Sequence, residues 1–126
     1  MKDQKKFEKW AMVYLKKLSK ILLLEHFTPI EITLSKKMKN GVLAEFGWSH
    51  PYQTISIYYH QDLLEDFKKG KKTSIVGVLA HEMCHALTDP LYEHAIRRYV
   101  EKDAVNDERE KLTDHIANII LKADLL

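Results

Sequence analysis

Two histidines and a glutamate lie close together in the segment His81-Glu82-Met83-Cys84-His85. On a helix, residues four apart lie about 40° apart around the axis, so the imidazoles of His81 and His85 would point the same way. Glu82 would lie about a quarter turn from His81, beside a metal ion held between the two rings. This spacing is typical of zinc peptidases that activate water with a glutamate base. It therefore predicts one zinc ion bound by His81 and His85, with Glu82 catalytic.

The spacing has this meaning only on a helix, and the flanking residues predict one. Thr73-Ser74 offers an N-cap, and apolar residues fill most of the following turns. Asp89-Pro90 predicts the end of the helix, which we expect over residues 73–87. Cys84 falls on the far side from His85 and is expected to pack in the core. The alternative, a chance match on an ordinary core helix, would leave buried polar groups without partners.

A catalytic zinc ion usually takes three protein ligands and keeps a fourth position for water. In a C-terminal helix expected over residues 105–125, Glu110 and Asp114 lie about 40° apart on the edge that borders the apolar face. Glu108 and His115 fall on the polar side. Because Glu110 has the longer side chain, we expect it to be the third ligand, and Asp114 to accept a hydrogen bond from the outer nitrogen of a zinc histidine. The alternative is a solvated acidic pair at the helix edge.

With both motifs in place, the chain resembles the gluzincins, the thermolysin-like clan of zinc metallopeptidases, and in scale the single-domain minigluzincins. In that clan a downstream helix supplies a glutamate ligand, and an aspartate four residues later supports a zinc histidine. Residues 110–117 are similar to that pattern, and the resemblance covers about residues 73–121. It implies a zinc-dependent hydrolase of peptide bonds, with ligands His81, His85 and Glu110 and with Glu82 as the base.

Three other readings of the same residues stay open. The SprT-like proteases have a similar sequence pattern around His81 and His85 but use a third histidine, which here would be His94. Regulator-cleaving phage and radiation-response peptidases carry an acidic-x-x-Ala-Asn pattern, similar to residues 114–118, that would make Asp114 the ligand. A non-catalytic, zinc-stabilised interaction module would keep the ligands but would have no need of Glu82.

Hydrophobic periodicity predicts one α+β domain over residues 1–126. Apolar residues from Phe7 to Leu22 recur at three- and four-residue spacing and indicate an N-terminal amphipathic helix. Three strands are expected over residues 30–34, 42–48 and 54–59, and short helical segments over 62–68 and 92–101. We therefore expect an N-terminal helix, a small, mostly antiparallel sheet of three or four strands, the His-Glu-x-x-His helix and the C-terminal glutamate helix.

The strand over residues 54–59 directly precedes the helical half of the chain. We expect it to form the edge of the cleft, to which a peptide or protein substrate would add as a further strand. The expected substrate contacts are Thr54, Ile55, Ser56, Ile57 and Tyr58. Trp48, Tyr52 and Tyr59 could also line the cleft, although aromatic residues in strands usually pack against neighbouring side chains.

Composition limits the classes of partner. The net charge is +2, with 45% hydrophobic and 30% charged residues, which is ordinary for a soluble globular protein and gives no reason to expect nucleic acid. Recurring lysines interrupt the N-terminal apolar segment, so neither a signal peptide nor a membrane span is expected. The single cysteine cannot form an internal disulfide, which favours a reducing compartment, and we expect a cytoplasmic protein.

Overall fold

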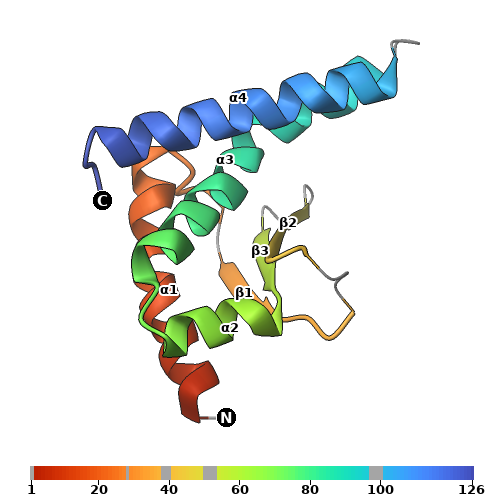
Figure 1. Ribbon diagram of the computed structural model, residues 1–126. Coiled ribbons are helices and arrows are strands. Elements are labelled where there is room, and N and C mark those ends of the chain that lie inside the picture. The colour runs from red at the N-terminus through yellow and green to blue at the C-terminus, as the bar shows by residue number, and fades with distance from the viewer. Residues whose placement is uncertain (1, 28, 38–40, 50–53, 97–100) are drawn as a thin grey trace.

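The computed structural model describes residues 2–27, 29–37, 41–49, 54–96 and 101–126, and Figure 1 shows how their helices and strands are arranged. Those ranges contain four helices and three strands, so the expected α+β fold is confirmed. In chain order they are α1 (Lys2–Ile21), β1 (Ile30–Leu34), β2 (Ala44–Ser49), β3 (Thr54–Tyr59), α2 (Gln61–Lys68), α3 (Lys72–Ile96) and α4 (Lys102–Lys122).

Helix α1 forms where the apolar periodicity predicted it. Its residues Phe7, Ala11 and Leu15 are fully buried, so the apolar face of the helix lies in the core. The ring of Phe7 packs edge-on against Tyr59 of β3, with centroids 4.8 Å apart. The Tyr59 hydroxyl donates a hydrogen bond of 2.8 Å to Glu8 Oε1. Helix α1 also contacts α3, so it joins the sheet to the helical half of the protein.

The sheet is mixed, whereas a mostly antiparallel sheet was expected. The strand order is β1-β3-β2, with β3 parallel to β1 and antiparallel to β2. Ile55, Ile57 and Tyr59 of β3 are fully buried, as suits a central strand. The prediction that β3 forms the free edge of the cleft is therefore wrong, because its backbone is already paired on both sides. Strand β2 pairs with β3 alone among the described strands.

Helix α3 is longer than predicted, because it continues through Pro90 to Ile96. The prediction of a helix end at Asp89-Pro90 is wrong, and residues 92–96 belong to α3 and not to a separate helix. Proline inside a helix costs about 3 kcal/mol, but contacts with α4 on both sides of Pro90 favour continuation. Thr88 is hydrogen-bonded to Thr113 at 2.7 Å, and the Arg109 guanidinium lies over the Tyr92 ring, 3.9 Å from its centroid.

Helices α3 and α4 form an antiparallel hairpin, and the end of it that joins the two helices projects beyond the sheet in Figure 1. Helix α4 begins at Lys102, three residues before the predicted start at 105. Strand β2 contacts α3, and the ring of Phe46 stacks near that of His85, with centroids 6.3 Å apart. Among the described helices, none has the length and apolar character needed to cross a membrane.

Candidate metal centre

Three side chains from the α3–α4 hairpin converge as the sequence predicted. The Nε2 atoms of His81 and His85 lie 3.2 Å apart. Glu110, which comes from α4, places Oε2 3.3 Å from His81 Nε2 and Oε1 3.6 Å from His85 Nε2. One potential ligand atom from each residue lies within 4.8 Å of the other two. This His-His-Glu group could hold a metal ion.

The outer nitrogen of each histidine meets a carboxylate. His81 Nδ1 lies 2.6 Å from Asp114 Oδ1, as the helical-face argument predicted. His85 Nδ1 lies 2.8 Å from Asp89 Oδ1. When Nδ1–H donates to a carboxylate, the Nε2 lone pair is left free to bind a metal ion. The two carboxylates therefore hold both rings in an orientation in which the Nε2 atoms could bind a metal ion.

Asp89 is a residue whose role the sequence reasoning missed. It was interpreted only as part of a helix stop, yet α3 continues past it and keeps it on the face that carries His81 and His85. Its position four residues after His85 is the signal that could have identified it. Asp89 and burial act on His85 in opposite directions. Burial lowers the pKa of His85, but the hydrogen bond and the charge of Asp89, together with the charges of Glu82 and Glu110, outweigh it, so the pKa is raised overall.

Glu82 lies beside the cluster and is only 8% exposed. Its Oε2 is 3.9 Å from His81 Nε2, so the carboxyl group lies beside the potential ligand atoms. The outer nitrogens of the two histidines are held by Asp114 and Asp89 and not by Glu82. Burial raises the pKa of Glu82 to about 7, against the opposing pull of the two histidines. A carboxyl group with a pKa near neutrality can both accept and release a proton.

Arg109 is the second residue that sequence reasoning missed. Its Nη1 lies 3.5 Å from Asp89 Oδ1, and its Nη2 lies 3.5 Å from Glu110 Oε1. The guanidinium stacks on Tyr92 and also donates to Asn106 Oδ1. Arg109 directly precedes a predicted ligand, but the helical projection places it toward the apolar face of α4. Its contacts with α3 could not be read from that projection.

A cavity of about 430 Å³ adjoins the metal centre. Its lining combines the proposed base with small and apolar side chains, and the lining residues are Leu43, Ala44, Ser74, Gly77, Val78, His81, Glu82, Asp114, Ala117, Asn118 and Leu121. They come from the start of β2, from α3 and from α4. The predicted substrate residues Thr54 to Tyr58 lie instead in the central strand, where Ile55 and Ile57 are buried in the core.

The remaining predictions about single residues divide into three groups. Cys84 is fully buried, as expected of a packing residue, and burial raises its pKa to about 11. Glu108 and His115 are exposed, as expected. The side chains of His94, Trp48 and Tyr52 lie outside the described part of the structure, so the predictions for them stay predictions.

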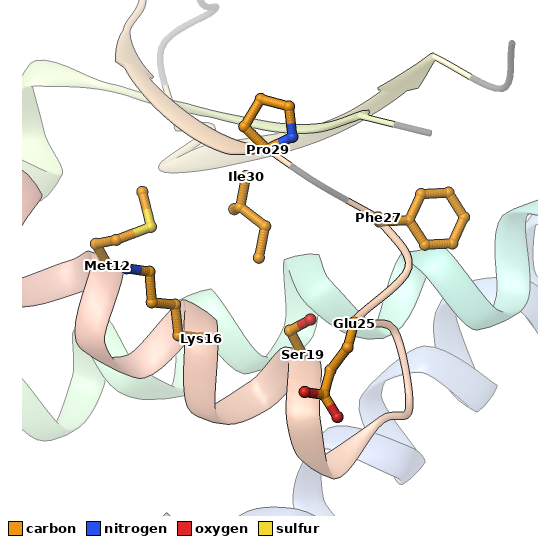
Figure 2. A pocket seen from close by; sticks show the side chains of 7 residues that line it. All are labelled: Met12, Lys16, Ser19, Glu25, Phe27, Pro29 and Ile30. Atoms are coloured by element: carbon orange, nitrogen blue, oxygen red, sulfur yellow. The ribbon is translucent and has the colours of Figure 1, made fainter. Parts of the chain in front are cut away.

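A second cavity, of about 530 Å³, lies between α1 and the segment that leads into β1. Figure 2 shows its lining, which consists of Met12, Lys16, Ser19, Glu25, Phe27, Pro29 and Ile30. None of these residues belongs to the metal centre. The cavity therefore adds no ligand or base to the His-His-Glu group.

Comparisons with protein families, with characterised proteins and with solved structures found no match for this chain. The gluzincin resemblance therefore depends on the residues and the geometry described above, and it stays a prediction.

Proposed function

We propose that this protein is a zinc-dependent peptidase that hydrolyses peptide bonds, with Glu82 as the general base. The observation that carries the proposal is the convergence of His81, His85 and Glu110 beside a buried glutamate. In a chance cluster, the outer Nδ1 atoms of the two histidines would have no particular reason to meet carboxylates. Here both histidines are held by carboxylates, as metal-binding histidines commonly are.

The donor set supports zinc as the bound metal. Two imidazole nitrogens and one carboxylate are a common set of protein ligands in catalytic zinc sites, where a fourth position stays open. When bound there, zinc would supply a Lewis acid that polarises a carbonyl group and lowers the pKa of water toward neutrality. His81, His85 and Glu110 would hold the ion, and Asp114 and Asp89 would keep the two rings in the required orientation.

Glu82 supplies the proton chemistry in this proposal. Its carboxylate takes a proton from the attacking water and passes that proton to the nitrogen of the leaving amine. The cavity beside Glu82 gives a substrate room to reach the carboxylate. The non-catalytic module is the weaker candidate, because a purely structural site has no use for a buried carboxyl group that borders a cavity.

Because β3 is the central strand, we propose that a substrate binds beside β2 instead. Ala44 of β2 and the preceding Leu43 line the cavity with His81 and Glu82, and Phe46 stacks near His85. The edge of β2 away from β3 is unpaired among the described strands. We propose that an extended peptide adds to this edge and so brings a peptide bond to Glu82.

The test is Glu82→Gln, which keeps the shape of the side chain and removes its ability to accept a proton. The variant should bind one zinc ion per chain and lose about 10²–10⁴-fold in the rate of peptide hydrolysis. Hydrolysis is measured with a library of quenched fluorescent peptides, and zinc by elemental analysis of folded protein. Glu108→Gln, the same change at an exposed glutamate of α4, is the control and should leave both measurements unchanged.

Two results would contradict the proposal. Folded wild-type protein that takes up no zinc would remove its basis. Wild-type protein that holds one zinc ion and leaves the whole library uncut would favour the interaction module.

A further inference from the structure

Arg109 of α4 contacts two acidic side chains that belong to different helices. Its Nη1 lies 3.5 Å from Asp89 of α3, and its Nη2 lies 3.5 Å from Glu110 of α4. Asp89 in turn holds the outer nitrogen of His85 at 2.8 Å. A continuous path of polar contacts therefore runs from His85 through Asp89 and Arg109 to Glu110. The path closes where Glu110 Oε1 lies 3.6 Å from His85 Nε2.

We propose that Arg109 is a positioning residue that fixes His85 and Glu110 relative to each other, acting on His85 through Asp89. This inference depends on the metal site proposed above, because it assigns a role in building that site. Arg109 contacts the ligand Glu110, and no contact between Arg109 and the proposed base Glu82 is seen in the described part of the chain, so its role is positioning and not catalysis.

Charge gives the first reason for an arginine at this position. Asp89 and Glu110 are both acidic and both approach His85, and their mutual repulsion would drive them apart. The guanidinium lies within ion-pair distance of both carboxylates and offsets that repulsion. Arg109 is about one-fifth exposed and Asp89 slightly less, so water screens this pair only in part.

Geometry gives the second reason. A guanidinium is a planar fork whose two ends can contact two carboxylates at once, which a lysine ammonium cannot do with the same rigidity. The fork is held by stacking on Tyr92, which is 8% exposed, and by Asn106 Oδ1. Tyr92 lies near the end of α3 and Asn106 near the start of α4, so the guanidinium is held from both helices.

His81 provides an internal comparison within the same site. Its outer nitrogen is held by Asp114, and no contact between Arg109 and Asp114 is seen in the described part of the chain. Glu110 approaches Nε2 of both rings, so loss of the guanidinium can change that side of either histidine. At the outer nitrogens, the loss should disturb Nδ1 of His85 and leave Nδ1 of His81 on Asp114. A residue that merely stabilised the hairpin would affect the two rings alike.

The first measurement is zinc affinity, determined by competition with a chromogenic chelator. Arg109→Met keeps a long side chain against Tyr92 and removes the charge, and it should weaken zinc binding about 10–100-fold, the usual effect of losing support for a metal ligand. Arg109→Lys should restore only part of the loss. Lys111→Met removes a charge two residues away, where the lysine is exposed and forms an ion pair with Glu108, and it should bind zinc like the wild type.

The second measurement follows the ring nitrogens of the metal-free protein by ¹H–¹⁵N correlation spectroscopy at one fixed pH. In Arg109→Met the Nδ1–H signal of His85 should be lost or shifted, and the Nδ1–H signal of His81 should stay at its wild-type position. Asp89→Asn, which removes the charge that Arg109 contacts, should reproduce the His85 change. If Arg109→Met fails to fold, Arg109→Lys takes its place in this comparison, because Asp89→Asn removes a direct partner of His85 and so changes the His85 signal whatever Arg109 does.

Three outcomes would overturn the inference. They are wild-type zinc affinity in Arg109→Met, an unchanged His85 signal in either variant, and equal changes at His81 and His85. Because the spectroscopic comparison needs no metal ion, it separates this inference from the proposed function. A wild-type protein that binds no zinc contradicts the function, whereas an unresponsive His85 contradicts the role of Arg109.

Discussion

Glu110 and Asp114 lie one turn apart on α4, yet they contact different atoms of the histidines. Glu110 approaches the inner Nε2 atoms of both rings, at 3.3 and 3.6 Å. Asp114 meets the outer Nδ1 atom of His81 alone. A metal ion between the rings would therefore bind Glu110 directly. Asp114 would affect metal binding only by fixing the orientation of the His81 ring.

This difference predicts an order of zinc affinities. Glu110→Ala should weaken zinc binding most, because it removes a direct ligand. Asp114→Ala should cost about 10–100-fold in affinity, the usual effect of removing a partner of a zinc histidine. His115→Ala, next along the helix and exposed, is the matched control and should bind normally. The measurement is a zinc titration against a competing chelator.

The same titration distinguishes the rival resemblances. A severe loss in His94→Ala with normal binding in Glu110→Ala would favour the SprT-like arrangement. A severe loss at Asp114 alone would favour the peptidases with the acidic-x-x-Ala-Asn pattern.

Local spacing was enough to place some residues of the site but not others. The i, i+4 rule predicted that His81 and His85 share a face, and the helical projection predicted the inward edge that carries Glu110 and Asp114. Arg109 was missed because two of its partners, Asp89 and Tyr92, lie on α3, and the projection of one helix contains no information about its neighbour. Asp89 escaped because the proline after it was interpreted as a helix stop.

At the scale of elements, a buried pair of hydroxyl groups joins α3 to α4. Thr113 is fully buried and donates to the Arg109 carbonyl at 2.8 Å. The Thr113 hydroxyl oxygen also lies 2.7 Å from Oγ1 of Thr88, which is 3% exposed. Because the Thr113 proton is used toward Arg109, Thr88 donates to Thr113. These bonds lie next to the Arg109 turn and help to set the register of the hairpin.

Thr113→Val should therefore destabilise the protein by about 1–3 kcal/mol, because it leaves the buried Thr88 hydroxyl without a partner. The double variant Thr88→Val/Thr113→Val should be less destabilised than Thr113→Val alone, since both hydroxyl groups are then replaced by apolar groups of similar shape. Urea unfolding of the wild type, of Thr88→Val, of Thr113→Val and of the double variant measures the coupling. Strictly additive losses would show that the two hydroxyl groups do not depend on each other.

The elements themselves were largely predictable, but their neighbours were not. Alternation in residues 54–59 correctly indicated a strand, yet the same pattern suits a central or an edge position. The choice depends on long-range pairing, which places β3 between β1 and β2. Pro90 shows a similar limit, because its local cost to α3 is outweighed by packing against α4, a segment about twenty residues away in the chain.

At the scale of the whole molecule, the proposed metal ion would add a further link between two helices that already meet through packing, hydrogen bonds and ion pairs. A ligand that binds only the folded state stabilises it, by about 2.7 kcal/mol when the free ligand is at one hundred times its Kd. Chelation of zinc should therefore lower the Tm of the wild-type protein. The double variant His81→Ala/His85→Ala is the control, and its Tm should not respond to the chelator. An equal response in the two proteins would place the stabilising metal ion elsewhere.

The hairpin also has a consequence for the growing chain, because the proposed ligands are far apart in the order of synthesis. His85 precedes Glu110 by 25 residues (110 − 85). At about 5–20 residues per second, a ribosome adds that interval in roughly 1–5 seconds. For that time a nascent chain carries both histidines and the proposed base without the proposed third ligand, so the proposed hydrolytic centre would be incomplete. Under the function proposed above, chain order alone would delay the onset of proteolysis until α4 has been made and has folded back on α3.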